Sequence, residues 1–404
     1  MTQDQVALPQ TAGVVIIGGG VIGASTAFQL TRRGVRPLLL ERRQLGAGAS
    51  GKSGALVRVH YANTFEASLT LRSLDVFRNW KDVVGAGDAG FVQAGFLQVV
   101  APEDEANLRT NVAALRGIGA NTWLVGPGEI REIDPLMRTS DITAAAYEPE
   151  SGYCDPNGAT YGFAEAAEAA GATIATHVEA TEIVVEGGRV VGVETSRGRV
   201  DTERVLIAGG AWANRLLHPL GVDLGLVPRR LQVAIFRHPP GLPPGLGHRV
   251  VIDATNHSWL RPEGQNATLI GAERQAFEGD PDTYSQSVDP PVIDDARRAL
   301  ANRYAIFDHA TMRGGWAGIV MMSADSHPVL DRVPGVEGAF VFTGDSGTSF
   351  KTSPAVGAVL ADWMTDGGTA GFDVTPFRAS RFAEGNPWVD PTGYTSMPFQ
   401  SVSR

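Results

Sequence analysis

The chain has 404 residues, of which 43% are hydrophobic, and it carries 34 basic against 44 acidic side chains. This length exceeds the size at which one hydrophobic core usually keeps growing, so about two domains are expected. The excess of acidic groups argues against a nucleic acid or an anionic membrane as the main partner, which leaves small molecules.

The cysteine and histidine content argues against disulfides and metal sites. Cys154 is the only cysteine, which excludes an intramolecular disulfide and a cysteine-rich zinc site. A packed thiol is expected there, since nothing nearby would lower its pKa. The eight histidines are scattered without metal-binding spacing, so no metal site is expected.

The N-terminal region bears on localisation. The first ten residues, MTQDQVALPQ, lack the basic and apolar regions of a secretory signal, which predicts a cytoplasmic protein. Residues 11–30 are twenty positions without a charge, about the length of a membrane span. Their glycines and polar side chains fit a buried strand, a turn and a helix better, so no membrane span is expected.

The first predicted elements form a strand–helix–strand unit. Residues 14–17 are a β-branched run, residues 21–33 repeat apolar side chains at helical spacing, and residues 35–40 read as a second buried strand. Glu41 closes that strand 18 residues after Gly23, where a dinucleotide fold carries a carboxylate for the adenosine ribose. The same carboxylate would repel a 2′-phosphate, which disfavours NADP.

The glycines of GGGVIG, residues 18–23, each have an expected task. Gly18 makes the turn, Gly20 lets a diphosphate approach the backbone, and Gly23 allows the helix to pack close to the strand. The helix N-terminus, which begins with Val21 and Ile22, then faces the anion. A glycine-rich turn in an ordinary α/β domain remains the alternative.

The rest of the chain predicts a mixture of helices, strands and turns. Helices are expected in the second half of 54–80 and at 103–118, 158–170, 293–304 and from 354 onward. Strands are expected within 91–100, in a hairpin at 181–195, at 205–210 and 339–343, and between 228 and 277, where 238–247 is a Pro/Gly-rich turn.

Two later returns of the strand-plus-glycine pattern favour a flavin over a nicotinamide cofactor. They are VLIAGGAW at 205–212, which contains Gly209, and FVFTGDSGTSFKTSP at 340–354. An NAD dehydrogenase usually keeps its dinucleotide domain contiguous. Residues 344–349 can instead offer backbone N–H groups, with a helix N-terminus behind them, to a flavin edge that becomes anionic on reduction.

Taken in order, these motifs resemble the FAD-dependent amine and amino-acid oxidoreductases grouped with D-amino acid oxidase, glycine oxidase and monomeric sarcosine oxidase. The resemblance runs from about residue 13 to residue 363. It is carried by IIGGGVIGAS with Glu41, GASGKSGALVR, the DP at 155–156, VLIAGGAWA, Asp325 with HPVLDRVPGVEGAFVFTGDSG, and SFKTSPAVG.

The resemblance implies an α/β fold in which a Rossmann-like FAD-binding domain of the glutathione-reductase type is interleaved with a β-rich, α+β substrate domain. We predict the FAD-binding domain at 12–85, 150–227 and 325–380, the substrate domain at 86–149 and 228–324, and a C-terminal tail at 381–404.

The resemblance also implies the residues that hold FAD. The ADP half would contact Gly18, Gly20, Gly23, Glu41 and Arg42; the diphosphate and ring would approach Ser50, Gly51 and Ser53; and the flavin edge would lie by Gly344, Ser346, Gly347 and Lys351. Monomeric sarcosine oxidase links its flavin to a cysteine shortly before the position of Asp325. Residues 311–325 contain no cysteine, so noncovalent FAD is expected.

Arg58 and Lys351 match an arginine and a lysine that bind the substrate carboxylate in the sarcosine oxidases. An arginine fork and an ammonium on converging loops can fix one carboxylate and so place a C–H bond over flavin N5. A surface ion pair for Arg58 and a flavin or solvent contact for Lys351 remain alternatives. His60 and Tyr61 are candidate catalytic residues that could instead pack beneath the loop.

Other side chains have two interpretations each. His257, Ser258 and Trp259 could wall the substrate or pack in the core, Trp316 could be core or face the flavin or substrate, and His327 is expected to be structural.

The expected reaction is hydride transfer to the flavin from the carbon of a small N-methylated or otherwise secondary amino acid, giving an imine that water hydrolyses. The sarcosine oxidases activate O2 with a lysine whose position falls here in ATLIGAE, 267–273, and no lysine occurs between Lys81 and Lys351. This favours a dehydrogenase that passes electrons to a carrier, or an oxidase that reacts slowly with O2, over an oxidase that uses O2 efficiently. A D-amino acid or 2-hydroxy acid dehydrogenase and a noncatalytic flavoprotein assembly factor remain alternatives.

Overall fold

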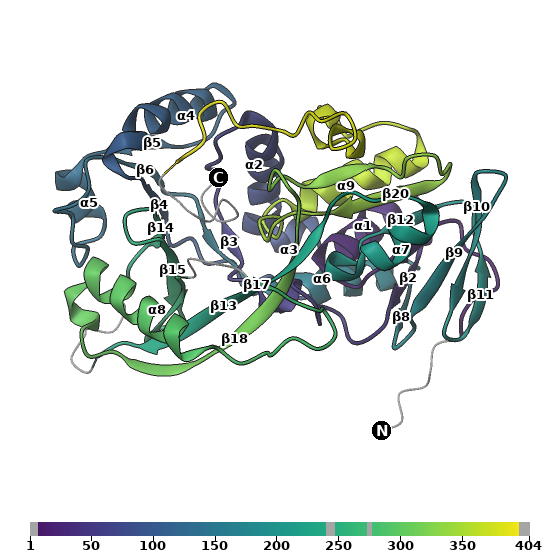
Figure 1. Ribbon diagram of the computed structural model, residues 1–404, viewed down its shortest axis with the longest axis horizontal. Coiled ribbons are helices and arrows are strands. Elements are labelled where there is room, and N and C mark those ends of the chain that lie inside the picture. Colours follow the sequence, from purple (N-terminus) through teal and green to yellow (C-terminus); the bar gives the residue numbers. More distant parts are fainter. Residues whose placement is uncertain (1–6, 240–246, 273–276, 396–404) are drawn as a thin grey trace.

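The computed structural model describes residues 7–239, 247–272 and 277–395. Figure 1 shows a larger group of helices and strands around β12 and β20, and beside it a second sheet that includes β4, β14 and β15. The architecture is mixed α/β, as predicted.

The first sheet joins strands from distant parts of the sequence. Its order is β8, β2, β1, β12, β20, β19, with parallel pairing up to β20 and an antiparallel edge strand β19. The strands are β1 Val15–Ile17, β2 Leu38–Glu41, β8 Thr173–Thr176, β12 Val205–Ile207, β19 Val329–Arg332 and β20 Ala339–Thr343. The strands expected at 14–17 and 339–343 are therefore confirmed, and the strand expected at 205–210 is shorter, because it ends at Ile207 before the glycines. The strand expected at 35–40 begins at Leu38, directly after Pro37, which has no N–H to donate.

Both faces of this sheet are covered, which explains why its strands are apolar throughout. Ile16, Leu39 and Leu206 face a helical layer, while their chain neighbours face the other side. The helical layer consists of α1 Val21–Thr31, α6 Pro156–Ala169 and α9 Ser353–Thr365. The opposite layer is a small antiparallel sheet of β9 Ala180–Glu186, β10 Arg189–Thr195 and β11 Gly198–Asp201, which contains the predicted hairpin.

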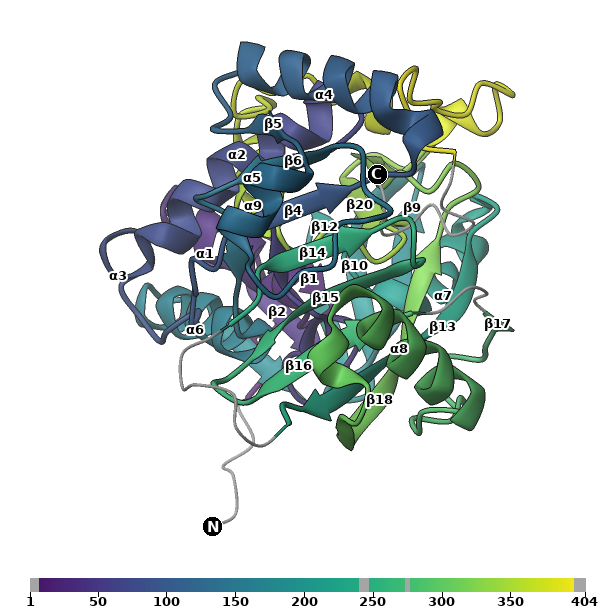
Figure 2. The ribbon, with the colours of Figure 1, turned by 90° about the vertical axis from the view of Figure 1, so that its left-hand side faces the viewer.

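The second sheet has the order β17, β13, β16, β15, β14, β4, β6, β5, with β18 paired to β13. Its strands are β4 Phe96–Val99, β5 Trp123–Val125, β6 Ala145–Glu148, β13 Val227–Arg237, β14 Val250–Asp253, β15 Ser258–Glu263, β16 Ala267–Gly271, β17 Phe277–Glu278 and β18 Thr311–Met322. In Figure 2, α5 Pro127–Ile133 and α8 Pro290–Arg303 lie over the outer face of this sheet, where their apolar residues join its core.

The long strands β13 and β18 connect the two parts of the fold. They pair from Val227 with Met322 to Arg237 with Thr311. The remaining elements are α2 Thr64–Arg78, α3 Trp80–Val83, α4 Glu105–Gly117, α7 Asn214–Leu217 and the short pair β3 Leu56–Val57 and β7 Gly152–Tyr153.

Several predicted boundaries shift for identifiable reasons. The helices expected from 158 and 293 begin at Pro156 and Pro290, because proline is favoured in the first helical turn. Of the region 91–100, only Phe96–Val99 forms an extended strand. Most of the turn expected at 238–247 lies outside the described residues.

The uncharged run at 11–30 folds as β1, a glycine turn and α1, which ends at Thr31. Within the described ranges, no helix combines the length and the apolar character that a membrane span requires. The same ranges contain no cluster of histidine, cysteine and acidic side chains that could hold a metal ion.

The segment expected as a C-terminal tail is packed against the protein as far as residue 395. Figure 1 shows it crossing from α9 toward α4. Arg381 is fully buried and Tyr394 is nearly so. This segment therefore contributes to the core instead of trailing from it.

Candidate active site

A cavity of about 510 Å³ opens where the parallel strands of the first sheet end. Ile17, Glu41, Ala208 and Thr343, at or just after the carboxyl ends of β1, β2, β12 and β20, line it. Crevices at this edge of an α/β sheet are the usual ligand sites of such folds. The cavity continues to the second sheet, where Val233 and Ile252 line it.

Steric contacts explain the glycines of the first turn. Gly18 has φ +116°, and a Cβ there would lie 2.3 Å from the carbonyl oxygen of Ala208. A Cβ on Gly23 would lie 2.0 Å from the carbonyl oxygen of Gly18, so this glycine lets α1 begin against the turn. Gly18 and Gly20 line the cavity together with Val21 and Ile22, whereas Gly23 lies outside its lining.

A Gly23→Ala variant is expected to lose FAD, because the added methyl group must push α1 away from the turn. We expect FAD affinity to fall at least tenfold and the free energy of unfolding to fall by about 1–3 kcal/mol. Absorbance of the purified protein and titration of the apoprotein with FAD measure this. Gly13→Ala is the control, because a Cβ on Gly13 would meet nothing within 4 Å; equal loss of FAD in both variants would contradict the steric account.

Two backbone N–H groups hold the carboxylate of Glu41, the residue that the sequence predicts to contact the adenosine ribose. Its Oε2 accepts from the Gly19 N–H at 2.8 Å and its Oε1 from the Arg43 N–H at 2.7 Å. Each carboxylate oxygen retains a second lone pair that can accept from a ribose hydroxyl. The residues present at this end of the cavity therefore fit an adenosine.

Arg42 lines the same end of the cavity and is held by residues that the sequence analysis missed. Its guanidinium lies 4.5 Å from the ring centroid of Trp212 and pairs with Asp282, which also accepts from Trp212 Nε1 at 2.9 Å and pairs with Arg215. The hydrogen bond from Arg42 lowers the pKa of Asp282. Asp282 lies 70 residues from Trp212 in sequence, so only the fold reveals this cluster.

The second small-residue loop contributes polar groups beside the first turn. Ser50 Oγ accepts from the Val21 N–H at 3.0 Å, and Ser53 also lines the cavity. Gly51 lies behind the lining, where a Cβ would be 2.4 Å from the carbonyl oxygen of Gly46. Lys52, which the sequence analysis did not single out, lines the cavity, and its ammonium bonds Tyr284 Oη and Gln286 Oε1 at 2.5 and 2.9 Å.

The loop after β20 contains three left-handed residues, but backbone donors of this loop bond within the protein. Ser346 and Gly347 have φ of +53° and +78° and line the cavity, while Gly344, with φ +64°, lies behind them against Leu226 and Ser323. The Ser346 N–H donates to the Met321 carbonyl at 3.0 Å, the Thr348 N–H to the Asp345 carbonyl at 3.1 Å and the Ser349 N–H to Asp345 Oδ2 at 3.3 Å, so these three N–H groups, which were expected to face a flavin edge, are bonded elsewhere. Asp345 also lines the cavity, and burial raises the pKa of its carboxyl group.

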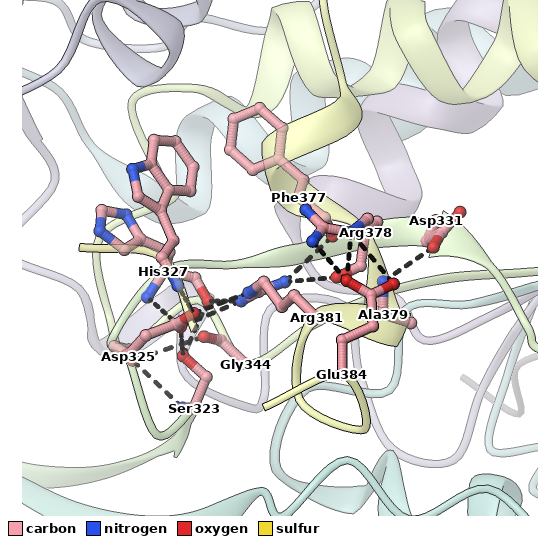
Figure 3. A network of polar contacts seen from close by, with 12 residues as sticks. Ser323, Asp325, His327, Asp331, Gly344, Phe377, Arg378, Ala379, Arg381 and Glu384 are labelled. Atoms are coloured by element: carbon pink, nitrogen blue, oxygen red, sulfur yellow. Dashed lines mark hydrogen bonds and ion pairs between the residues drawn. The ribbon is translucent and has the colours of Figure 1, made fainter. Parts of the chain in front are cut away.

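A buried polar network supports this loop from behind (Figure 3). Arg381 donates to Asp325 from Nε at 2.7 Å and from Nη2 at 3.0 Å. The Ser323 hydroxyl donates to the His327 carbonyl at 2.7 Å, and the Ser323 N–H donates to Ser346 Oγ at 3.3 Å. The expected structural role of His327 agrees with its burial and its contact with Glu66 Oε2 at 2.8 Å.

Arg58 and Lys351 both line the cavity, although 58 and 351 are far apart in sequence. They are 2% and 5% exposed. The Arg58 guanidinium lies 4.9 Å and the Lys351 ammonium 4.7 Å from the ring centroid of Tyr61. The Thr348 carbonyl accepts from Lys351 Nζ at 2.7 Å and from Tyr61 Oη at 3.3 Å. The surface ion pair considered for Arg58 is therefore excluded by its burial.

His60 and Tyr61 lie behind Arg58, outside the cavity lining as described. The His60 carbonyl accepts a hydrogen bond from Arg58, and Tyr61 joins the two cations as described above. Burial, with the nearby Arg58 charge, lowers the pKa of His60 to about 3. Its imidazole is therefore neutral at physiological pH. Their position indicates support of Arg58 rather than contact with a ligand.

Aromatic residues enclose the cavity on the side of the second sheet. Trp259 is wedged between Gly54 and Gly271, where a Cβ would come 2.3 and 2.4 Å from its indole. Trp316 lines the cavity and donates from Nε1 to the Lys52 carbonyl at 2.8 Å. The open question about Trp316 is thereby settled in favour of the cavity.

Some polar groups in the lining have no partner within the protein as described. They are Thr343 Oγ1, Ser258 Oγ and His257 Nδ1. Buried polar atoms are normally hydrogen-bonded, so these three atoms are exceptions among the described residues. Cys154 is buried away from the lining, and burial raises the pKa of its thiol.

Comparison with known proteins agrees with this geometry. The family described as DAO, FAD dependent oxidoreductase, matches residues 13–363. The chain is 28% identical over 376 residues to the glycine oxidase of Geobacillus kaustophilus, covering 91% of this chain and 96% of that protein. It is 24% identical to the sarcosine oxidase subunit beta of Rhodobacter capsulatus, covering 92% and 90% of the two chains.

Solved structures show the same likeness. The L-proline dehydrogenase of P. horikoshii superposes with a TM-score of 0.87 at 26% identity, covering 94% of this chain and all of the other. The crystal structure of the Geobacillus kaustophilus glycine oxidase gives 0.80 at 27% identity, covering 92% and 99%. Because the family match spans most of the chain and includes the glycine turn, Glu41 and the loop after β20, this chain belongs to the DAO family of FAD-dependent oxidoreductases, and its cofactor is FAD.

Proposed function

We propose that the protein oxidises the C–N bond of a small N-methylated or otherwise secondary amino acid to an imine. The observation that carries this proposal is the pair of buried cations, Arg58 and Lys351, which line the cofactor cavity and contact one aromatic ring. Two buried cations at one place favour an anionic group, and a bidentate arginine suits a carboxylate. A small amine that carries a carboxylate satisfies both requirements.

The substrates named for the relatives support this class. Glycine, sarcosine and L-proline are small amino acids, and the last two are secondary amines. For this chain, the preference for a secondary amine is our proposal.

The cofactor would be held at both ends by residues of the described cavity. We assign the ADP half to Gly18, Gly20, Val21, Ile22, Glu41, Arg42, Ser50 and Gly209, and the ring to Ser53, Ser346, Gly347 and Lys351, with Gly23, Gly51 and Gly344 acting from behind. FAD supplies the two-electron acceptor when bound. Its attachment is noncovalent in this proposal, because 311–325 contains no cysteine. The division into FAD-binding and substrate domains at the predicted boundaries is also proposed.

The protein groups bind, orient and shield the substrate. Arg58 and Lys351 hold the carboxylate, and fixing that group fixes the neighbouring carbon relative to the cofactor site. Trp259 and Trp316 exclude water from the enclosed space. The neutral His60 lies outside the lining, so we propose that the amine binds unprotonated and that its own lone pair assists loss of hydride.

We propose that the electron acceptor is a carrier protein or small oxidant other than O2. The β16 stretch, where an oxygen-activating lysine would fall, is Ala267–Gly271, and the Trp259 indole packs against Gly271. An indole at this place offers no ammonium to stabilise reduced oxygen. After anaerobic reduction by substrate, admitted air should reoxidise the flavin far more slowly than a dye acceptor does; reoxidation at turnover rates would contradict this.

An anaerobic reduction screen tests the main proposal. Sarcosine, dimethylglycine, proline, D-alanine and 2-hydroxyglutarate are mixed with the oxidised protein, and the flavin absorbance band is followed. We expect sarcosine or proline to bleach the band within seconds, and dimethylamine, which lacks a carboxylate, to leave it unchanged. Bleaching by D-alanine or 2-hydroxyglutarate alone would favour the alternative dehydrogenases, and no bleaching by any compound would favour an assembly factor.

A further inference from the structure

The carboxylate-binding Arg58 is supported by a segment that lies beyond the family match. That match ends at residue 363, whereas residues 386–395 return along α2 and α4. We define these ten residues as the strap. It is fixed by Asn107 Nδ2 to the Gly393 carbonyl and by Asn111 Nδ2 to the Thr392 carbonyl, both at 3.0 Å.

One strap residue reaches the support of Arg58. Tyr394 Oη lies 2.6 Å from His60 Nε2, and the two rings are stacked with an interplanar angle of 14°. Asn111 Nδ2 lies 3.0 Å from the same Tyr394 oxygen. All three side chains are buried.

These hydrogen bonds link a helix residue to His60 through the strap. The Asn111 Nδ2 group can only donate, so Tyr394 Oη accepts from it. His60 is neutral, and its Nε2 shares one hydrogen bond with Tyr394 Oη, whose donor is set by the nitrogen that carries the ring proton. Hydrogen bonds therefore connect Asn111, Tyr394 and His60 in series.

His60 in turn presents its backbone carbonyl to the Arg58 guanidinium. Glu148 Oε2 holds the same stretch by accepting from the Val59 N–H at 2.9 Å. A guanidinium binds a carboxylate well only when its plane is fixed, since bidentate bonding has a narrow geometry. We propose that Tyr394, acting through His60, is a positioning residue that orients Arg58 for the substrate carboxylate. This inference rests on the proposed role of Arg58.

The test uses the whole holoprotein and propionate, a carboxylate without an amine, titrated through the shift of the flavin absorbance band. Tyr394→Phe removes only the hydroxyl group and should raise the Kd of propionate about three- to tenfold, the effect of one hydrogen bond. Asn107→Ala is the matched control, because it removes a strap contact that does not reach His60, and it should change the Kd less than twofold.

A double-mutant cycle shows whether Tyr394 acts through Arg58. Adding Tyr394→Phe to Arg58→Met should cause no further rise in Kd. An equal rise in both backgrounds, or an equal rise in Asn107→Ala, would overturn the inference, as would an unchanged Kd in Tyr394→Phe. If Arg58→Met itself leaves the Kd unchanged, the proposed carboxylate role fails instead.

A second pair of variants covers the case in which Tyr394→Phe does not fold. His60→Gln keeps an amide oxygen that can accept from Tyr394 and should bind propionate within about threefold of the wild type. His60→Leu has no acceptor and should show the same loss as expected for Tyr394→Phe. Equal Kd values for these two variants would contradict the inference.

Discussion

Replacing Arg58 with methionine is expected to raise KM for sarcosine or proline at least a hundredfold. The guanidinium is 2% exposed, lies between the Tyr61 and Phe96 rings and lines the cavity. Without it, the substrate carboxylate would enter a buried site in which only Lys351 remains to compensate its charge. Leaving one partner of a buried charge pair unmatched costs about 3–5 kcal/mol, which is a factor of roughly 10² to 4 × 10³ in binding.

Steady-state kinetics with a dye acceptor measures this loss. Methionine keeps the length and apolar bulk of the arginine stem, so flavin content and melting temperature should stay near the wild type. Arg72→Met is the control, because Arg72 is an exposed residue of α2 outside the cavity lining. A KM for Arg58→Met within threefold of the wild type would remove the carboxylate clamp from the proposal.

Replacing Arg381 with methionine is expected to lower the free energy of unfolding by about 3–5 kcal/mol at pH 7. Arg381 is fully buried, and its partner Asp325 is nearly so. Burial alone would raise the pKa of Asp325, but the hydrogen bonds and charge of Arg381 and two backbone N–H bonds outweigh it, and the pKa is lowered. The variant would leave a buried carboxylate without its counterion behind the loop that carries Ser346.

The difference in free energy of unfolding between the wild type and Arg381→Met should change with pH in a predictable direction. In the wild type the lowered pKa of Asp325 contributes stability that is present above the unfolded-state pKa of Asp, about 3.9, and is lost as pH falls through the folded-state value. In Arg381→Met the pKa of Asp325 rises, so protonation relieves the buried charge at higher pH. The stability gap between the two proteins should therefore be larger at pH 7 than at pH 5.

Urea unfolding at these two pH values measures the gap. Arg378→Met is a matched control on the same segment, since Arg378 pairs with Glu384 at the surface, as Figure 3 shows. Exposed pairs contribute less than about 1 kcal/mol, so this variant should unfold close to the wild type. Equal losses in the two variants would mean that burial of the Arg381 pair is not what stabilises the segment.

The amino-acid sequence alone determined the cofactor half of this protein. The β-branched strands, the glycines of residues 18–23 and Glu41 form a local pattern, because a strand, a tight turn and a helix are set by contacts between near neighbours. The family match and the parallel sheet agree with that interpretation. Apolar alternation also predicted the hairpin at 181–195, which β9 and β10 form.

Only the tertiary structure decided which side chains support the two ends of the cavity. Asp282 contacts Arg42 across 240 positions, Trp259 contacts Gly54 across 205 positions and Tyr394 contacts His60 across 334 positions, and no local period marks these contacts. The segment after residue 380 was expected as a C-terminal tail, yet Arg381 and Tyr394 are buried in it. Long-range packing determines which side chains become buried, because it depends on their shape and charge and not on their spacing in the sequence.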